Sequence, residues 1–275
     1  MSKKPSFLGR FYMAIILFFL YAPIFVLIVF SFNSTRSRTV WTGFSLQWYQ
    51  RLFTDGTILD AFYTTLIIAA LAAVISTVAG TFAAVGFYNM KRRWRVPLTQ
   101  VNNIPMMNAD IVTGVSLSLL FVSLGSALRF SLGFGTLLIA HVVFCIPYVV
   151  LAIMPKLRQI DRHLVDAACD LGCTWMQAFR KVIVPEIRPG IINGLIIAFT
   201  LSIDDFVISY FTAGGNIMTL PMQIFAMTRR RVSPEINALS TILFMSVLIL
   251  LIIINIRDIK QEERLKRRSG AAHAK

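Results

Sequence analysis

The sequence has little charge for its length. Only 15% of its 275 residues are Asp, Glu, Lys or Arg, whereas a soluble domain carries about a quarter. Acidic residues are the scarcest, with 13 Asp and Glu against 27 Lys and Arg, and the net charge is +14. The apolar fraction is 56%. These proportions exclude an ordinary soluble domain and predict a polytopic membrane protein.

The sequence also lacks the residues that catalysis or metal binding needs. It has no G-x-x-x-x-G-K-[ST] segment, so the chain cannot hold nucleotide phosphates by that route. Its few cysteines and histidines are too scattered for a zinc, disulfide or catalytic constellation. They are Cys145, Cys169, Cys173, His141, His163 and His273. We interpret the cysteines as structural residues and His141 as a packing or hydrogen-bonded residue. We therefore expect no enzymatic activity, metal site or bound cofactor in this chain.

Six apolar segments are about long enough to cross a bilayer as helices. They cover approximately 11–32, 61–88, 100–124, 133–155, 190–211 and 236–256. We expect an all-α membrane domain over 11–256, with short tails at 1–10 and 257–275. The second segment is rich in Ala, Gly and Ser, which let helices approach closely in lipid. We therefore expect it near the centre of the bundle.

Lys and Arg are distributed unevenly between alternate loops. Of 27, 20 lie in the N-terminal tail, 89–103, 156–190 and the C-terminal tail. Positive residues stay on the cytoplasmic side, so both termini and the 161–189 segment are predicted to be cytoplasmic. The exception is Arg229–Arg231, which either lines an outer vestibule, contacts an extracytoplasmic partner or is a solvated charge run.

The longest polar interruption, 161–189, carries helix signals. Asp161 is a candidate N-cap, and Gly172 is suited to end the first helix because glycine enters the left-handed conformation cheaply. Thr174 and Gln177 have the spacing of a capping box for a second helix, which we expect Pro185 to stop. The apolar positions are Leu164, Val165, Ala168 and Leu171, then Trp175, Phe179, Val182 and Ile183. The segment either folds onto its own bundle or docks another protein.

This segment resembles the EAA motif of ABC importer permeases, which reads E-A-A, three residues, G, nine residues, then I-x-L-P. The matching positions are Asp166, Ala167, Ala168, Gly172, Val182, Val184 and Pro185. Asp166 replaces the usual Glu, so a contact of that Glu would differ. The resemblance implies a type I ABC importer permease whose coupling helix, with Trp175 and Phe179 on it, docks a separate ATPase subunit. That subunit would bind ATP and Mg²⁺. It also implies a sister permease and an extracytoplasmic solute-binding protein as partners, with no role for nucleic acid.

Three carboxylates fall within predicted spans, where they are costly unless paired or hydrated. With the third span beginning at Pro97, Asp110 lies 13 residues in, and Asp204 lies 14 residues into the fifth. Both then lie roughly 20 Å from the cytoplasmic face of the membrane. Asp205 directly follows Asp204. No Lys or Arg lies in these spans, so the carboxylates suit a cationic substrate. The alternative is that they cap broken helices. Aromatic walls for a cation are available from Phe206, Tyr210 and Phe211.

Longer segments narrow the resemblance to the spermidine/putrescine ABC permeases, of the second permease subunit type. They are FTLSIDDFVIS at 199–209, VSPEINAL at 232–239, PIFVLIVFSFNS at 23–34 and the stretch around Asp110. The resemblance implies a polycation path along Asp110, Asp204, Asp205, Tyr210 and Glu235.

The sequence therefore predicts a permease subunit of the bacterial inner membrane that imports polyamines. A permease for another small solute, a stand-alone secondary transporter and a membrane scaffold remain as alternatives.

Overall fold

The computed structural model is helical, and its described part divides into two compact units that are treated separately below. One unit comprises the described residues of Met1–Gly56 and Ala226–Lys275, and the other is Thr57–Phe225. The residues that the structure describes are 7–35, 40–160, 164, 167–168, 170–230, 235–242, 244–246, 248–249 and 252. Among them no strand forms, and Asn33 and Phe44 make one isolated bridge.

The first unit begins with the apolar helix α1, Phe7–Phe30. Described side chains along α1 are exposed or half-buried, which fits a helix whose apolar surface faces lipid. The chain then turns at the buried Asn33, whose side-chain oxygen accepts the Thr42 amide at 2.9 Å. Trp48 of the short helix α2, Gln47–Thr54, donates its indole N–H to the Asn33 carbonyl at 2.6 Å. These bonds fix the path from α1 into α2.

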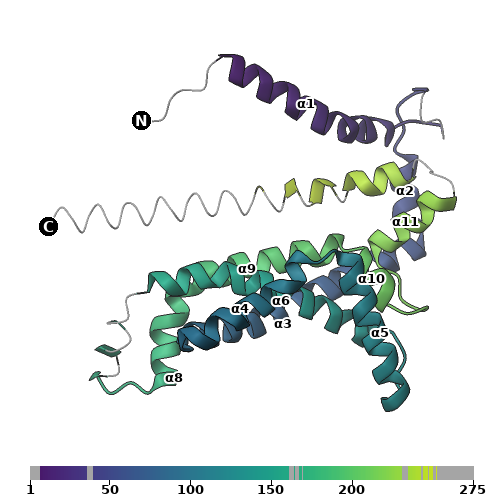
Figure 1. Cartoon of the computed structure of the whole chain (residues 1–275). Coiled ribbons are helices and arrows are strands. Elements are labelled where there is room, and N and C mark those ends of the chain that lie inside the picture. Colours follow the sequence, from purple (N-terminus) through teal and green to yellow (C-terminus); the bar gives the residue numbers. More distant parts are fainter. Residues whose placement is uncertain are drawn as a thin grey trace. The chain divides into compact units, whose positions relative to one another are not determined.

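The second unit contains most of the remaining helices (Figure 1). They are α3 (Gly56–Asn89, whose first residue belongs to the other unit), α4 (Arg92–Met107), α5 (Asp110–Leu128), α6 (Phe134–Gln159), α8 (Trp175–Ala178), the π-helical turn η1 (Phe179–Ile183), α9 (Val184–Asp204) and α10 (Val207–Thr212). Helix α11, Leu220–Arg230, begins in this unit and ends in the other.

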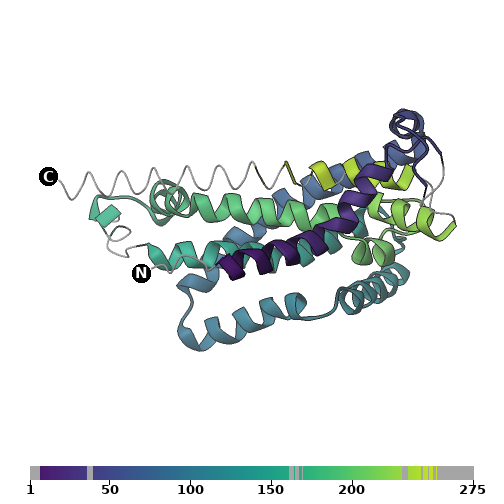
Figure 2. The ribbon, with the colours of Figure 1, turned by 90° about the horizontal axis from the view of Figure 1, so that it is seen from above.

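Helix α6 packs against α3 and α9, and the three run side by side (Figures 1 and 2). Val149 of α6 meets a glycine on each neighbour. A Cβ built on Gly80 of α3 would lie 2.7 Å from Val149 Cγ1, and one on Gly194 of α9 would lie 3.2 Å from it. The small residues predicted to place the second span at the centre of the bundle therefore do permit close helix packing.

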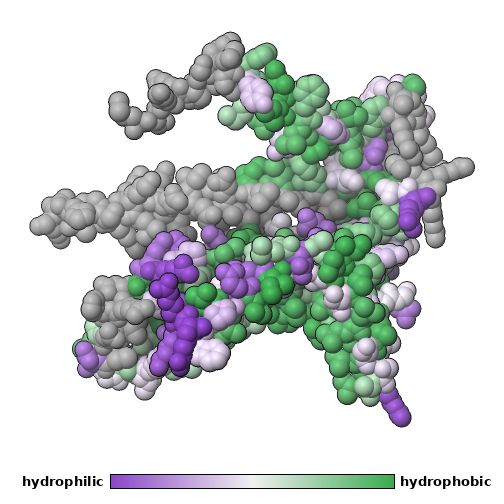
Figure 3. Space-filling view, in the orientation of Figure 1, coloured by the Kyte–Doolittle hydropathy of each residue, from purple (hydrophilic) through white to green (hydrophobic). Residues whose placement is uncertain are grey.

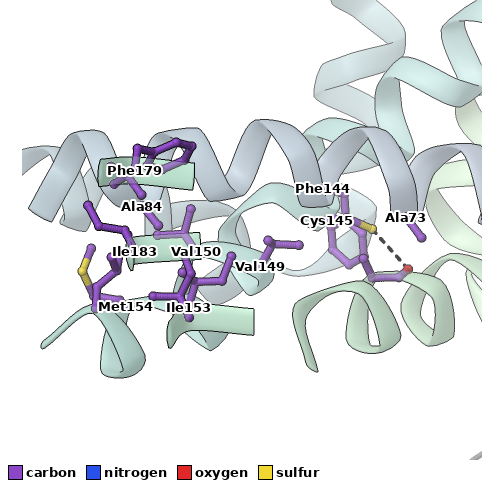
Figure 4. Close-up of a cluster of buried hydrophobic side chains, with 14 of the residues drawn as sticks. Ala73, Ala84, Phe144, Cys145, Val149, Val150, Ile153, Met154, Phe179 and Ile183 are labelled. Carbon is purple, nitrogen blue, oxygen red and sulfur yellow. Dashed lines mark hydrogen bonds between the residues drawn. The ribbon is translucent and has the colours of Figure 1, made fainter. Parts of the chain in front are cut away.

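A hydrophobic cluster fills the space between these helices (Figure 4). Val149, Val150 and Ile153 of α6 are almost completely buried in it. Cys145 is also buried, and its thiol donates to the Ala198 carbonyl of α9 at 3.5 Å. Cys145 is thus a packing residue, as expected.

Five helical stretches among the described residues are long and apolar enough to cross a membrane. They are Phe11–Phe30, Gly56–Asn89, Asp110–Leu128, Phe134–Gln159 and Trp175–Asp204. They coincide approximately with five of the six predicted spans. The sixth, 236–256, lies partly outside the described residues.

The segment expected as a single span over 100–124 is divided. Helix α4 ends at Met107, Asn108 and Ala109 are extended, and α5 begins at Asp110. Helix α4 carries four polar residues between Thr99 and Asn103, which makes it a poor lipid-spanning segment. Asp110 is therefore the first residue of its helix, and the assumption that it lies 13 residues along one helix from Pro97 was wrong.

The prediction that Pro185 stops a helix was also wrong. Helix α8, turn η1 and helix α9 follow one another without a break from Trp175 to Asp204. Proline lacks an amide hydrogen and its ring clashes with the carbonyl four residues earlier. In η1 the Val184 amide donates to the Phe179 carbonyl five residues earlier, and this widened turn accommodates the proline that follows.

Candidate functional site

The predicted fifth span, 190–211, is broken where its two carboxylates lie. Helix α9 ends at Asp204, Asp205 is extended, and α10 begins at Val207. The Asp205 carboxylate accepts the Ile208 amide at 3.3 Å and the Ser209 amide at 2.8 Å. It thus satisfies amides that the start of a helix leaves without partners, and its charge suits the positive end of the helix dipole.

A buried polar network holds this break against α6. His141 lies on α6 with 1% of its side chain exposed. Its Nδ1 lies 2.6 Å from Ser202 Oγ of α9, and its Nε2 lies 3.0 Å from Ser209 Oγ of α10. The Ser209 hydroxyl donates to Asp205 Oδ2 at 3.0 Å. One imidazole therefore joins three helices, and each polar group has a partner, as burial in a low dielectric requires.

Only one member of this network, His141, was correctly interpreted from the sequence. The interpretation of His141 as a hydrogen-bonded packing residue is confirmed. Its partners were missed, although Ser202 and Ser209 stand three residues before and four residues after Asp205. That spacing, around a carboxylate at a helix break, was the available signal.

The two adjacent carboxylates have different surroundings. Asp205 is largely buried, with 7% of its side chain exposed, and its oxygens accept bonds from the chain itself. Asp204 is exposed at the end of α9. The capping alternative therefore describes Asp205, whereas Asp204 is exposed.

Asp110 lies on a helix that packs against the same region. It is exposed in the first turn of α5. Gly114, four residues on, is buried against α10: a Cβ built on it would lie 3.4 Å from the Ile208 Cα and from the Val207 carbonyl oxygen. Four residues correspond to about 6 Å along a helix, so Asp110 lies about one turn from this contact.

Aromatic side chains surround the break. The Phe206 ring lies 5.5 Å from the Tyr210 ring and 4.5 Å from the Phe225 ring, and Tyr210 lies 5.5 Å from Phe211. Tyr210 is 52% exposed. An exposed ring with exposed carboxylates in the same region is an arrangement that can bind an organic cation.

Glu235 belongs to the other compact unit, where its carboxylate lies 3.6 Å from the Arg51 guanidinium. Arg51 also lies over the Trp48 ring, 5.3 Å from its centroid. A cation of the chain itself therefore stands beside Glu235.

In the polar element at 161–189, the turn at Gly172 and the capping box at Thr174 form as their residues predicted. Gly172 has a φ of +83°, and the Cys173 amide donates to the Ala168 carbonyl at 3.1 Å, which ends the first helix in a Schellman turn. The Thr174–Gln177 capping box forms, with bonds of 3.0 and 3.4 Å. Asp161 and Asp166 lie outside the described residues.

One side of this element is anchored and the other is exposed. Phe179 is buried, and its ring stacks on Trp175 at 5.6 Å and on Phe82 of α3 at 6.1 Å. Leu171 is 86% exposed and Met176 53% exposed. Ala167 is exposed beside them and Ala168 half-buried. Apolar side chains in open space next to a rigidly held helix form a surface suited to a protein partner.

Taken together, the apolar spans, the capped break and the polar helical element continuous with a long span define a membrane transport permease. Residues 76–260 match the family described as binding-protein-dependent transport system inner membrane component. The chain therefore belongs to this family, which confirms the resemblance to importer permeases.

Two curated relatives cover most of the chain. It is 38% identical over 247 residues to the spermidine/putrescine transport system permease protein PotC of Haemophilus influenzae, covering 90% of this chain and 95% of that one. It is 42% identical over 232 residues to the putrescine transport system permease protein PotI of Escherichia coli K12, covering 83% of each.

The fold is also similar to a solved structure. This is a bacterial ABC transporter involved in the import of the acidic polysaccharide alginate, with a TM-score of 0.70, 14% identity and coverage of 92% of this chain and 99% of that one. At this identity the similarity concerns the fold alone, which is that of an ABC importer permease.

Proposed function

We propose that this chain is the membrane-spanning permease subunit of an ATP-driven importer of polyamines. The observation that carries the proposal is its identity of 38–42% to permeases named for spermidine and putrescine transport. The exposed carboxylates of Asp110 and Asp204, near exposed Tyr210, support it chemically. Ammonium groups of a polyamine are attracted by carboxylates and by aromatic faces.

Within this proposal the carboxylates have separate roles. Asp110 and Asp204 attract the cation in the path, with Tyr210 as an aromatic wall. Asp205 is a positioning residue, because its bonds to Ser209 and Ile208 hold the break open. Glu235 is paired with Arg51, so it contributes to the path only if the substrate competes with Arg51 for its carboxylate.

The partners follow from the family to which the chain belongs. An inner membrane component of a binding-protein-dependent system works with a solute-binding protein, and we assign it a sister permease and two ATPase subunits as well. ATP and Mg²⁺ belong to the ATPases. The excess of Lys and Arg in alternate loops supports a cytoplasmic position for both termini.

The 161–189 element is the part that the ATPase moves. Leu171 and Met176 provide exposed apolar contacts, and Trp175–Asp204 is a continuous helix. A displacement at Trp175 therefore passes as rigid-body motion to the break at Asp205. Asp166, Gly172 and Pro185 belong to this element by the motif.

The proposal is tested by uptake of labelled putrescine and spermidine into cells that depend on this importer. Replacing Asp204 with Asn is expected to reduce uptake about tenfold, which corresponds to the loss of a cation–carboxylate contact worth about 1.4 kcal/mol. Asp60→Asn, at an exposed position of α3, is the matched control. Equal uptake by the two variants overturns the assignment of the path.

A further inference from the structure

A large cavity lies at one end of the second unit, where α3 ends, α4 begins and α6 ends. Its volume is about 610 Å³, and a second cavity of about 600 Å³ adjoins it. The two share Tyr88, Arg92, Arg95 and Ile160. The lining of the first is completed by Val96, Thr99, Gln100 and Arg158. We refer to the first cavity as the arginine pocket.

The arginine pocket concentrates positive charge. Arg92 and Arg95 lie one turn apart at the start of α4, and Arg158 comes from the last turn of α6. Among the described residues no carboxylate forms a salt bridge with any of the three. Like charges around one cavity repel one another, and a bound anion relieves that repulsion. Guanidinium groups bind phosphate through paired hydrogen bonds.

The surroundings of the pocket indicate a membrane–water interface. It lies where the spanning helices α3 and α6 end. Trp94, between Arg92 and Arg95 of α4, is 59% exposed, and Val101 further along α4 is 60% exposed. Tryptophan and arginine are enriched at the level of lipid headgroups. Figure 3 shows hydrophilic side chains gathered at this end of the unit, next to apolar surface.

We propose that the arginine pocket binds the phosphate group of an anionic phospholipid from the surrounding bilayer. Its volume falls within the range of about 300–1,000 Å³ that small-molecule sites occupy. Val96 is half exposed and lines the pocket, so an apolar side chain lies beside the proposed phosphate position. Clustered basic residues between transmembrane helices recognise such headgroups.

A lipid in this position joins parts of the chain that matter for transport. Ile160 lines both cavities and directly precedes the 161–189 element, and Trp175 of that element lines the second cavity. The bound headgroup therefore holds the α3–α4 turn to the base of the element. This inference rests on the membrane location of the chain and does not depend on which solute it carries.

The test is lipid binding to the complete complex as it is purified from the membrane. Phosphatidylglycerol is titrated in detergent and its binding followed by native mass spectrometry, with phosphatidylcholine as the neutral reference. Arg95→Gln or Arg158→Gln is expected to weaken phosphatidylglycerol binding about fivefold, and the double variant about 25-fold, at roughly 1 kcal/mol per basic residue. Arg93→Gln removes the same charge from the same turn but does not line the pocket, so it should leave binding unchanged.

The alternatives give different results. Equal loss in Arg93→Gln and Arg95→Gln overturns the site, because charge alone then explains binding. If inorganic phosphate binds with the same arginine dependence and displaces the lipid, the ligand of the pocket is a soluble anion and the lipid proposal is overturned. If residue 95 crosslinks to a carboxylate of another subunit and lipid binding is unchanged in Arg95→Gln, the arginine contacts a protein partner and not a lipid. Arg95→Lys keeps the charge and serves as a control for misfolding of the Arg95→Gln variant. It should weaken lipid binding less than Arg95→Gln does. An equal or larger loss contradicts the proposal.

Discussion

Gly80 lies at a close contact between α3 and α6, so a larger residue there should disturb the packing of these helices. A Cβ there would lie 2.7 Å from the Val149 side chain, and Val149 is also confined by Gly194. Valine has few alternative rotamers, so Gly80→Ala is expected to lower the free energy of unfolding by about 1–3 kcal/mol. Thermal unfolding of the purified protein in a fixed detergent measures this, and Val149→Ala should restore most of the loss.

Gly86 on the same helix is the control for this prediction. A Cβ at Gly86 meets no atom within 4 Å. Gly86→Ala should therefore raise stability by up to about 1 kcal/mol, because alanine favours a helix more than glycine does. Changes of the same sign at Gly80 and Gly86 would show that α3 and α6 do not pack as described.

Substitution of Asp205 should affect thermal stability, whereas substitution of the adjacent Asp204 should affect transport. Asp205→Ala removes a helix cap worth about 0.5–2 kcal/mol and leaves buried donors without an acceptor, so its melting temperature is expected to fall. Asp204→Asn, at an exposed position, should keep the melting temperature and lose uptake. If Asp205→Ala melts like the parent, its carboxylate is not the structural cap that the hydrogen bonds indicate.

At the scale of elements, features set by neighbouring residues were predictable and features set by tertiary contacts were not. The left-handed Gly172 and the Thr174–Gln177 box each need only a few residues, and both were predicted. The passage of Pro185 through a continuous helix depends on the widened turn before it. The partners of His141 lie more than 60 residues away, and no local pattern specifies them.

The 161–189 element should dock its partner through its exposed side chains. Leu171→Ser with Met176→Ser is expected to leave thermal stability unchanged, because both side chains are largely exposed, and to reduce recovery of the ATPase with the permease. Phe179→Ala, at the buried anchor against Phe82, should instead destabilise the permease itself by about 3–5 kcal/mol. Unchanged ATPase recovery by the serine variant would remove this surface from the interface.

At the scale of the whole molecule, composition and periodicity were sufficient for the class. Long apolar segments predict helices that cross a membrane, and five such helices are present among the described residues. The division of two predicted spans into separate helices was harder to predict, because the breaks at Asn108–Ala109 and at Asp205 are flanked by apolar residues. The exposed carboxylates beside those breaks were recognised by residue type, whereas their distinct roles required the hydrogen bonds.

We expect this chain to carry polyamines across the membrane in an ATP-driven assembly. The most direct measurement is uptake of labelled putrescine and spermidine by proteoliposomes containing the complete importer and its binding protein, with and without ATP. Uptake is expected to require ATP, to be lost in Asp204→Asn and to be retained in Asp60→Asn. Polyamine uptake without ATP, or full ATP-driven uptake by Asp204→Asn, would contradict this expectation.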